Sequence, residues 1–325
     1  MIKGNILITS AGRRVSLVKA FQYELENLNI EGKVFCADLV PELSSACQIA
    51  DKAFKVKRVT EDNYIEELLS LSIKHNVKLI IPTIDTELKE LASSIRRFKD
   101  NDIDILISDE PFVDKCRDKR EIHCFFDEIG FERARDIDIN KANYPIFVKP
   151  VDGSRSIGIF KLETENDLSK EILTNPKNMF LEYLSPNENT EYTVDIYFNK
   201  ESEILSIIPR ERIFVRDGEV NKACTRKNEI VSYIKEKFRN LRGIRGCITL
   251  QVFKNNLNGK IIGIEINPRF GGGYPLSYLA GGNFPRWIIQ EYMLNQRLVE
   301  YKDDWKDNTL MLRYDAEVIT HGFKN

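Results

Sequence analysis

The sequence predicts a mixed fold, in which an α/β unit built on a parallel sheet precedes an α+β region with antiparallel sheets. Over residues 1–110, short apolar runs alternate with segments of helical periodicity, which is typical of β-α-β units. From residue 144 onward, strand-like segments follow one another with short connections, which indicates antiparallel pairing. The 325 residues exceed one compact core and suit two or three packed units.

The first third provides the elements of the parallel sheet in order. Strands are expected at 5–9, 33–37, 53–56, 77–81 and 103–107. Between them, apolar residues recur with helical spacing over 15–28, 65–73 and 88–95. Because strands that alternate with helices of this length are joined by right-handed crossovers, we expect one parallel sheet.

The character of the sequence changes near residues 110–115, where a polar helical stretch begins that runs to residue 129. Further strands are expected at 144–149, 157–162, 178–184, 190–199 and 203–215. A softer division lies near residue 185, between two halves of this β-rich region. We therefore predict three parts, 1–110, 111–185 and 186–325.

The composition argues against several classes of protein. With 48 basic and 50 acidic residues, the net charge of -2 provides no electrostatic footprint for nucleic acid or an anionic membrane. We expect neither a signal peptide nor a membrane-spanning segment, because the first residues lack a signal-peptide pattern and no apolar run reaches about 18 residues. Its six cysteines lack the C-x-x-C spacing of zinc and redox sites. We expect a cytoplasmic protein that acts on small molecules, without nucleic-acid or membrane partners.

The first strand-to-helix turn, Ser10-Ala11-Gly12-Arg13-Arg14, bears on nucleotide binding. It has one glycine and lacks the G-x-G-x-x-G pattern, so a nicotinamide-dependent enzyme is disfavoured. Backbone N–H groups at a helix start favour negative charge, so the turn could hold an anion. Two solvated arginines that cap a turn explain the same residues equally well, and the sequence leaves both interpretations open.

A loop of small residues follows the predicted strand that ends at Lys149. It reads Asp152-Gly153-Ser154-Arg155-Ser156-Ile157-Gly158. Small residues allow the backbone to approach a phosphate chain closely, and Lys149 adds a point charge for its oxygens. We expect residues 154–156 to form a mobile lid. An ordinary hairpin loop behind a surface lysine is the plain alternative.

A second group of candidates begins at the strand Phe180-Leu181-Glu182-Tyr183-Leu184. An apolar strand that opens into a linker can hold a flat base between two sheets, where backbone groups read the adenine edge. Glu191 is well situated to accept ribose hydroxyls, with Glu188 as its rival. Acidic residues at exposed strand ends are common, so this group is a weak signal without its neighbours.

The third group lies on a predicted hairpin, 248–253 and 261–266, with a polar Asn/Gly turn. Side chains alternate along a strand, so Glu265 and Asn267 share one face. The turn brings Gln251 opposite residue 263 or 265, on that same face. Oxygen ligands of this kind suit Mg²⁺ held jointly with substrate phosphates. An edge strand with one solvated glutamate is the alternative.

Residues around this hairpin complete the group. Ile264 and Ile266 are expected together on the opposite, core-facing side of the strand. Arg269 follows, and an arginine beside a metal–phosphate site can stabilise charge on a transferring phosphoryl group. The glycine run 271–273 would permit close backbone approach there, although it could equally be a simple helix-entry loop.

Two arginines, Arg210 and Arg212, lie one residue apart on the predicted strand 203–215, and therefore on one face of it. They could clamp a carboxylate or an acyl phosphate of the substrate. Solvated strand charges are an equally good explanation. Arg313 is a further and weaker candidate.

These groups, in this order and spacing, resemble the ATP-grasp superfamily, and most closely its carbamoyl-phosphate-synthetase-like and carboxylate–amine ligase members. The motifs span residues 119–269, and Glu265-Ile266-Asn267-Pro268-Arg269 is the most specific of them. Residues 1–110 are similar in character to the family's pre-ATP-grasp domain. The resemblance therefore implies that domain followed by a two-part ATP-grasp fold, with the phosphate loop in 111–185 and the metal site in 186–325.

The resemblance also implies roles for individual residues. The implied ATP-binding residues are Lys119, Lys149, Asp152, Gly153, Ser154, Arg155, Ser156, Gly158, Glu182, Tyr183, Leu184 and Glu191. The implied metal ligands are Gln251, Glu265 and Asn267, and the implied catalytic residues are Arg269 and Lys149. Gln251 departs from many relatives, in which aspartate is common, so one metal position should be weaker.

The implied activity is ATP-dependent ligation. Two Mg²⁺ ions, or Mn²⁺ in their place, would accompany ATP while a substrate carboxylate becomes an acyl phosphate that an amine or similar nucleophile attacks. Relatives are frequently dimers, so a homodimer is compatible with the resemblance. A non-catalytic nucleotide-binding protein that retains the fold is the alternative. The intact Lys149, Glu265, Asn267 and Arg269 argue against it.

Overall fold

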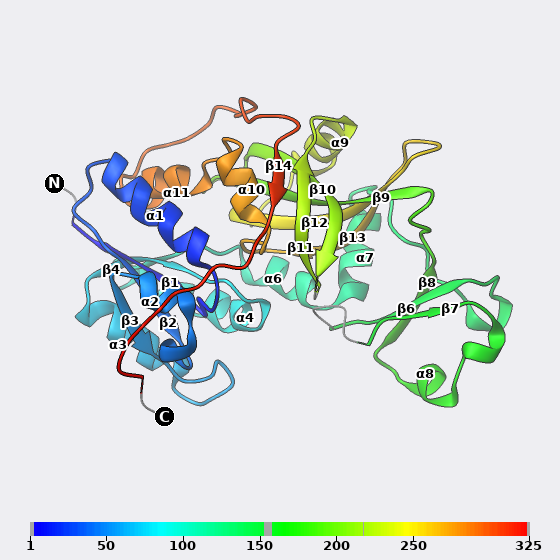
Figure 1. Ribbon diagram of the computed structural model, residues 1–325, viewed down its shortest axis with the longest axis horizontal. Helices are drawn as coiled ribbons and strands as arrows, with labels where there is room; N and C mark the ends of the chain where they lie inside the picture. The colour runs from blue at the N-terminus through cyan, green and yellow to red at the C-terminus, as the bar shows by residue number, and fades with distance from the viewer. Residues whose placement is uncertain (1–2, 153–157, 217, 324–325) are drawn as a thin grey trace.

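The computed structural model describes residues 3–152, 158–216 and 218–323. Its first unit is a five-stranded sheet with the strand order β3-β2-β1-β4-β5 (Figure 1). The strands are β1 (Asn5–Thr9), β2 (Val34–Asp38), β3 (Lys52–Lys55), β4 (Val77–Ile81) and β5 (Asp104–Ile105). All four pairings are parallel, which confirms the sheet expected from the alternation of strands and helices.

Helices cover both faces of this parallel sheet. They are α1 (Val15–Asn27), α2 (Ser45–Ile49), α3 (Tyr64–Lys74), α4 (Asp85–Ser93) and α5 (Ile95–Lys99). Alternate residues of β1 divide between two cores, because side chains of a strand point to opposite faces. Ile6 and Ile8 pack with residues of α1 and α2, whereas Leu7 packs with residues of α3 and α4.

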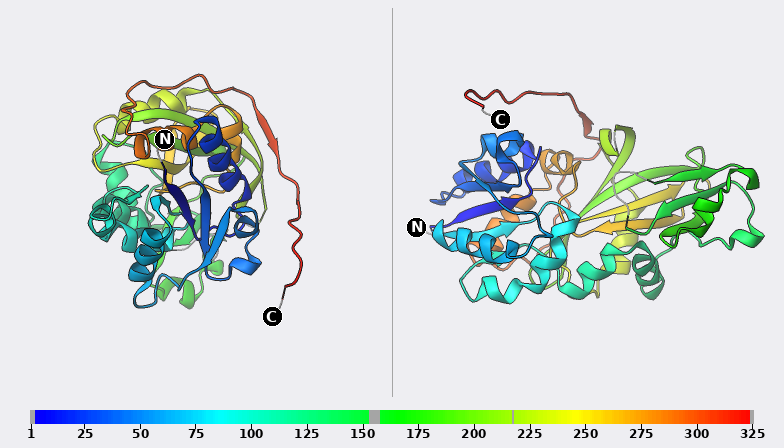
Figure 2. Two further views of the ribbon diagram at one scale, coloured as in Figure 1. Left: turned by 90° about the vertical axis from the view of Figure 1, so that its left-hand side faces the viewer. Right: turned by 90° about the horizontal axis from the view of Figure 1, so that it is seen from below.

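The second sheet has the strand order β7-β6-β8 and lies at the opposite end of the molecule from the parallel sheet (Figures 1 and 2). Its elements are β6 (Ile146–Pro150), β7 (Phe160–Leu162), β8 (Asn178–Glu182) and the helix α8 (Lys170–Thr174). Both pairings are antiparallel. The sheet has a small core of its own around Ile146, Val148 and Leu162.

The third sheet has six strands in the order β13-β12-β9-β10-β11-β14 and occupies the centre of the molecule (Figure 1). The strands are β9 (Asn189–Phe198), β10 (Ile204–Arg216), β11 (Glu219–Thr225), β12 (Gly246–Asn255), β13 (Ile261–Asn267) and β14 (Leu310–Leu312). All pairings are antiparallel. The expected antiparallel arrangement is therefore confirmed.

Five helices accompany this six-stranded sheet. They are α6 (Glu110–Arg117), α7 (Lys119–Glu128), α9 (Glu229–Phe238), α10 (Tyr274–Leu279) and α11 (Phe284–Tyr292). Phe126 of α7 and Phe238 of α9 share a core with Ile196 and Leu250 of the sheet. By contrast, α11 packs against α1, so it joins the six-stranded sheet to the parallel one.

Several predicted elements differ from the observed ones. The single helix expected from the stretch ending at 129 is divided at Asp118, whose backbone is extended. The Asp118 side chain caps α7, because its carboxylate accepts from the N–H of Arg120 at 2.8 Å. The strand expected at 103–107 is reduced to Asp104–Ile105. The sequence reading did not anticipate β11, α9 and α11. The three-part division stays a prediction. Its boundary near residue 185 separates α6 and α7 from the six-stranded sheet, although these helices share a core with that sheet.

Over residues 3–152, 158–216 and 218–323, no helix is both long enough and apolar enough to cross a membrane. The six cysteines are all unpaired thiols, four of them buried.

Candidate functional site

The side chains of the predicted metal group come from two neighbouring strands of the six-stranded sheet. Gln251 on β12 pairs with Glu265 on β13, and Thr249 pairs with Asn267. The amide of Asn267 donates to Glu265 Oε1 at 3.1 Å, so these two side chains share one face of β13. Gln251 donates to Glu191 on the adjacent strand β9. The structure therefore gathers the three predicted ligands on one side of the sheet.

The prediction that Ile264 and Ile266 share the core-facing side of β13 is wrong for Ile264. The ladder between β12 and β13 shifts register after Gln251, which leaves Ile264 as an extra residue on β13. Ile266 packs in the core of the six-stranded sheet, whereas Ile264 lies with apolar residues between the two antiparallel sheets. The shift interrupts the regular alternation of side chains, and the sequence period does not reveal it.

Two lysines from other elements approach Glu265. Lys149 on β6 is 4% exposed and donates to the backbone oxygen of Ile264 at 3.3 Å. Lys119, the first residue of α7, has its Nζ 3.8 Å from Glu265 Oε2. Burial lowers the pKa of Lys149 to about 8, with Glu265 opposing this shift and Lys119 adding to it. Lys149 is still protonated at neutral pH, so positive charge gathers beside the predicted metal ligands.

An apolar cluster joins the two antiparallel sheets next to these lysines. Its members from the three-stranded sheet and its linkers are Ala134, Phe147, Val151, Met179, Leu181 and Leu184. Its members from the six-stranded sheet are Phe253, Ile262 and Ile264. Phe147, Leu184, Phe253 and Ile264 are only partly buried, so they offer apolar surface from both sheets. Surfaces of this composition suit a flat aromatic base.

The predicted adenine hinge lies where β8 ends and the linker to β9 begins. The N–H of Glu182 donates to the backbone oxygen of Arg135 at 2.9 Å, and the Glu182 carboxylate accepts from Arg135 Nε at 2.8 Å. Tyr183 has Lys161 Nζ 4.3 Å from its ring centroid, and Leu184 joins the apolar cluster. Because the N–H of Glu182 is engaged, backbone reading of a base would depend on the residues that follow it.

The predicted phosphate loop is described only at its two ends. Outside the described residues lie Gly153, Ser154, Arg155 and Ser156. Lys177 donates to the Asp152 carboxylate at 2.7 Å and holds the pKa of that carboxyl below its usual value. Gly158 has a φ of 74°, a conformation that favours glycine. Asp152 is therefore engaged by a surface lysine, and its role in binding phosphate stays a prediction.

Arg269 connects the metal group with the parallel sheet. Its Nη2 lies 3.2 Å from Asn267 Oδ1 and 2.6 Å from Oδ2 of Asp85, the first residue of α4. Sequence reasoning missed Asp85. Its location just after β4, at the carboxyl edge of a parallel sheet, is the signal that could have identified it, because ligands of such sheets bind at that edge.

The glycine run after Arg269 makes room for neighbouring side chains. A Cβ added to Gly273 would lie 2.1 Å from Arg210 Nη1, and one added to Gly271 would lie 3.0 Å from Thr249 Oγ1. The first distance is too short for any residue larger than glycine. Gly273 is thus explained by packing against Arg210, in addition to the close backbone approach that the sequence suggested.

The prediction that Arg210 binds substrate is not supported by its surroundings. Its guanidinium is 1% exposed and forms two hydrogen bonds with Asp195, from Nε at 2.8 Å and from Nη2 at 3.1 Å. Ser277 of α10 donates to the same carboxylate at 2.6 Å. Arg210 does lie on the same face of β10 as Arg212, as predicted, but α10 covers this part of the sheet.

Arg212 occupies the uncovered part of that face. Its Nε lies 3.0 Å from Glu191 Oε1, and 14% of its side chain is exposed. Burial raises the pKa of Glu191, while Arg212 and Gln251 oppose the shift. Glu188 is exposed and lies in the linker before β9. Of the two rival acids, Glu191 is therefore the one that lies beside the predicted metal ligands.

The donor set fits a hard cation such as Mg²⁺. Side-chain oxygens come from Gln251, Glu265 and Asn267 on adjacent strands, and all three residues are only partly buried. Only one of them is a carboxylate, which suits an ion that shares its charge with substrate phosphates. Within the described ranges, no group of three or more His, Cys, Asp and Glu side chains is suited to holding a metal.

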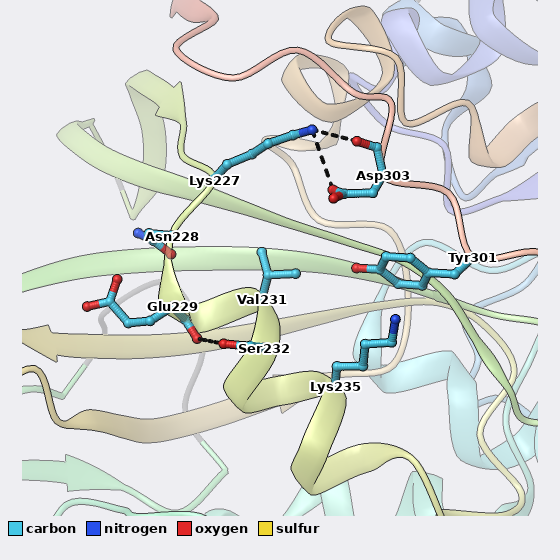
Figure 3. A pocket seen from close by; sticks show the side chains of 8 residues that line it. All are labelled: Lys227, Asn228, Glu229, Val231, Ser232, Lys235, Tyr301 and Asp303. Carbon is cyan, nitrogen blue, oxygen red and sulfur yellow. Dashed lines mark hydrogen bonds and ion pairs between the residues drawn. The ribbon is translucent and has the colours of Figure 1, made fainter.

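A shallow groove of about 450 Å³ lies elsewhere, between the start of α9 and the segment that precedes β14 (Figure 3). Lys227 bonds with Asp303 there, and Lys235 Nζ lies 3.7 Å from the ring centroid of Tyr301. None of its lining residues belongs to the predicted nucleotide or metal groups. The groove therefore does not mark the site. The candidate site is instead marked by Lys119 and Lys149, which lie next to the oxygen ligands on β12 and β13.

Two family models match the chain. Residues 6–106 match the model described as the PylC-like N-terminal domain, and residues 174–313 match the one described as ATP-grasp in the biosynthetic pathway with Ter operon. No curated protein is a significant match.

Solved structures resemble the chain over almost its whole length. The biotin carboxylase domain of 2-oxoglutarate carboxylase from Hydrogenobacter thermophilus, in complex with MgADP, ADP and bicarbonate, is 15% identical with a TM-score of 0.69, covering 95% of this chain and 74% of that one. Biotin carboxylase from Campylobacter jejuni is 14% identical with a TM-score of 0.71, covering 94% and 74%. N5-carboxyaminoimidazole synthetase from Staphylococcus aureus, complexed with ADP, is 17% identical with a TM-score of 0.69, covering 92% and 79%. At such identities the likeness establishes the fold, and it agrees with the predicted architecture.

Proposed function

Because this chain belongs to the ATP-grasp superfamily, we propose that it is an ADP-forming ligase that activates a carboxylate as an acyl phosphate for attack by an amine. The observation that carries the proposal is the location of two lysines at β13: Lys119 lies 3.8 Å from Glu265, and Lys149 donates to the backbone oxygen of the preceding residue, Ile264. Asn267 and Arg269 follow on the same strand and its extension. Cations and oxygen ligands in this arrangement suit a phosphate chain with its divalent metal.

The nucleotide would lie between the two antiparallel sheets. The apolar cluster that includes Phe147, Leu184 and Ile264 would hold the adenine, and Glu191 would accept the ribose hydroxyls. Lys149 and Lys119 would then bind phosphate oxygens. This assignment is supported by contact between the groups, because Ile264 belongs to the apolar cluster and its backbone oxygen accepts from Lys149. Three of the structures that resemble this chain are complexes with adenine nucleotides, which supports the proposal that the chain binds one.

The chemistry of the proposed reaction depends mainly on electrostatic stabilisation. The substrate carboxylate attacks the γ-phosphorus, and Lys149, Lys119 and Arg269 offset the negative charge that develops on the phosphoryl oxygens. Gln251, Glu265 and Asn267 would hold Mg²⁺, which supplies additional positive charge at the phosphates. The acyl phosphate then reacts with a bound amine, which must lose a proton as phosphate leaves. The released phosphate can accept that proton.

The proposal includes a reducing, cytoplasmic environment, which the six unpaired cysteines favour.

A screen for ADP release across amino acids and small carboxylates, with hydroxylamine present to trap acyl phosphates, tests the activity. We expect ADP and a hydroxamate to form together with at least one carboxylate, in a reaction that requires Mg²⁺. Calorimetric titration with ATP, ADP and NAD provides the control for binding. If Mg-ATP binds but neither ADP nor hydroxamate forms with any carboxylate, the chain is instead a non-catalytic nucleotide-binding protein.

A further inference from the structure

The carboxyl edge of the parallel sheet forms a second set of charged groups that the proposed chemistry does not use. In the strand order β3-β2-β1-β4-β5, the strand that follows β1 in the chain, β2, lies on one side of the central pair, and the strand that follows β4, β5, lies on the other. Ligands of open parallel sheets bind at such a switch point, outside the carboxyl ends of the strands. Here the turn 10–14 follows β1, and Thr83 and Asp85 follow β4. The segment after β4 lies beside the strand extension that carries Arg269, because Arg269 bonds with Asp85, and the turn after β1 is joined to that segment by the bond of Arg14 to Thr83.

Two acids, one of them completely buried, hold the turn after β1 in place. Ser10 and Gly12 have positive φ angles of 50° and 49°. The N–H of Gly12 donates to Asp38 Oδ2 at 2.9 Å, and the hydroxyl of Ser10 donates to Glu87 Oε2 at 3.0 Å. Glu87 is completely buried, and burial raises its pKa. The turn is therefore preorganised, as a binding surface requires.

The two arginines of this turn have different surroundings. Arg13 is exposed and lies 3.1 Å from Glu219, so it is the solvated arginine that the sequence allowed for. Arg14 donates through Nη2 to the backbone oxygen of Thr83 at 2.9 Å. Among the described residues, no carboxylate lies within ion-pair distance of Arg14. A guanidinium has five N–H donors, so most of those on Arg14 are available to a ligand.

Arg14 also lies close to the guanidinium of Arg269. Burial lowers the pKa of Arg14 to about 10, and the positive charge of Arg269 is the next largest cause. Arg269 Nε is buried and has no hydrogen-bond partner in the part of the chain that the structure describes. The carboxylates of Glu219, Asp85 and Glu87 oppose the shift at Arg14, and Asp85 also pairs with Arg269 at 2.6 Å. Both guanidiniums still have donors that these contacts leave unused, which favours a ligand with two negative charges.

We propose that this edge of the sheet is the site of the carboxylate substrate, and that the substrate is a small dicarboxylate held between Arg269 and Arg14. One carboxylate lies at Arg269, next to the predicted metal ligands, where it is activated. The second carboxylate lies on Arg14, which selects for it by paired N–H donors. This inference rests on the proposed ligase function, and it adds the chemical class of the substrate and the residue that determines it.

Matched ligand pairs test the inference directly. Protein saturated with MgADP is titrated by calorimetry with succinate and succinamate, L-glutamate and L-glutamine, and L-aspartate and L-asparagine. Each pair has nearly the same shape but differs by one carboxylate. We expect at least one diacid to bind about 10-fold or more tightly than its amide, as the loss of a charge-assisted hydrogen-bond pair predicts.

Variants of Arg14 and Arg13 then test which arginine causes the preference for the diacid over its amide. Arg14→Gln should remove the difference between diacid and amide, while Arg13→Gln, changed in the same turn, should retain it. Arg14→Lys keeps the charge without the planar fork and should lose most of the difference, so it serves if Arg14→Gln does not fold. Thermal unfolding of each variant with and without MgADP checks the fold and the nucleotide site.

The outcomes separate this inference from the proposed function. If MgADP itself does not bind, the proposed function fails. If MgADP binds but no diacid is preferred over its amide, or if Arg14→Gln keeps the preference, the assignment of Arg14 is overturned while the proposed ligase function stands.

Discussion

Two arginine–carboxylate pairs lie on one face of the six-stranded sheet, and their surroundings differ. Arg210 and Asp195 are 1% and 0% exposed beneath α10, where Ser277 satisfies the same carboxylate. Arg212 and Glu191, further along the same two strands, are 14% and 24% exposed beside Gln251. The residue types and the strand face are the same. Cover by a helix buries one pair completely, whereas the other pair remains partly exposed.

The largest effect is expected at the covered pair. Arg210→Gln leaves Asp195 buried without its cation, which should lower the free energy of unfolding by about 3–5 kcal/mol. Urea unfolding followed by circular dichroism measures this. The double change Arg210→Met with Asp195→Leu removes both charges and should recover part of the loss. A loss below about 1 kcal/mol in the single variant would mean that the pair is not desolvated as described.

An effect of comparable size, on activity rather than stability, is expected at Glu265 in the predicted metal group. Glu265→Ala removes the one carboxylate of the predicted metal group and should reduce ADP release by about 10²–10³-fold, roughly 3–4 kcal/mol. The thermal midpoint should stay unchanged, because this side chain is not part of the core. Glu300→Ala, at an exposed glutamate, is the control. ADP release that remains near wild type in purified Glu265→Ala would contradict the metal assignment.

The pH dependence of stability tests whether burial also controls a titratable group near Lys149. His123 on α7 is 2% exposed, and its pKa is lowered to about 4, first by burial and next by Lys149. Arg133 acts in the same direction, while Asp136 and Asp127 oppose it. In the unfolded chain this histidine titrates near pH 6.5, so between about pH 6.5 and 4 the unfolded state binds the proton first.

Stability should therefore be complete above about pH 6.5 and fall by up to about 3 kcal/mol as the pH drops to 4. His123→Gln removes the titrating group and should flatten this part of the profile. Urea unfolding at a series of pH values provides the measurement. An identical pH profile in the variant and the wild type would assign the acid sensitivity to other groups.

The smallest effect on stability is expected at the open pair. Arg212→Gln breaks a partly exposed ion pair and should change the free energy of unfolding by less than about 1 kcal/mol. The same change leaves Glu191 without its cation, so the KM for ATP should rise by about 10-fold with a smaller effect on kcat. Steady-state ADP release measures both constants. Equal losses of stability in Arg212→Gln and Arg210→Gln would remove the distinction between the two pairs.

The parallel sheet was predictable because its signals are local. Buried strands such as Asn5–Thr9 and Val77–Ile81 are short apolar runs, and the helices between them carry one apolar face. The division of the helical stretch at Asp118 was less visible, since a capping residue within a helical pattern differs little from a surface acid. The strand β11 was missed because its residues alternate irregularly between polar and apolar types.

Much of the candidate site was also predictable, because its residues lie close together in the chain. The alternation of a strand puts Glu265 and Asn267 on one face. The short turn brings Gln251 opposite residue 263 or 265, and in the structure it pairs with Glu265. The register shift at Ile264 was not predictable, since an extra residue in one strand depends on how the partner strand is packed. Asp85 and Glu191 come from distant segments, and although each occupies a suggestive position in the chain, their contacts with Arg269 and Gln251 have no local signal in the sequence.

The sequence by itself determined the change from a parallel to an antiparallel region, the order of the predicted nucleotide and metal groups, and the residue types available for the chemistry, because these depend on patterns over a few residues. Only the tertiary structure decided which charged groups are accessible. Arg210 and Arg212 are equivalent in the sequence pattern, as are Arg13 and Arg14, and they differ in the structure because α10 covers one strand arginine and the carboxyl edge of the parallel sheet encloses one turn arginine. Burial depends on segments that are far apart in the chain, so no local pattern encodes it.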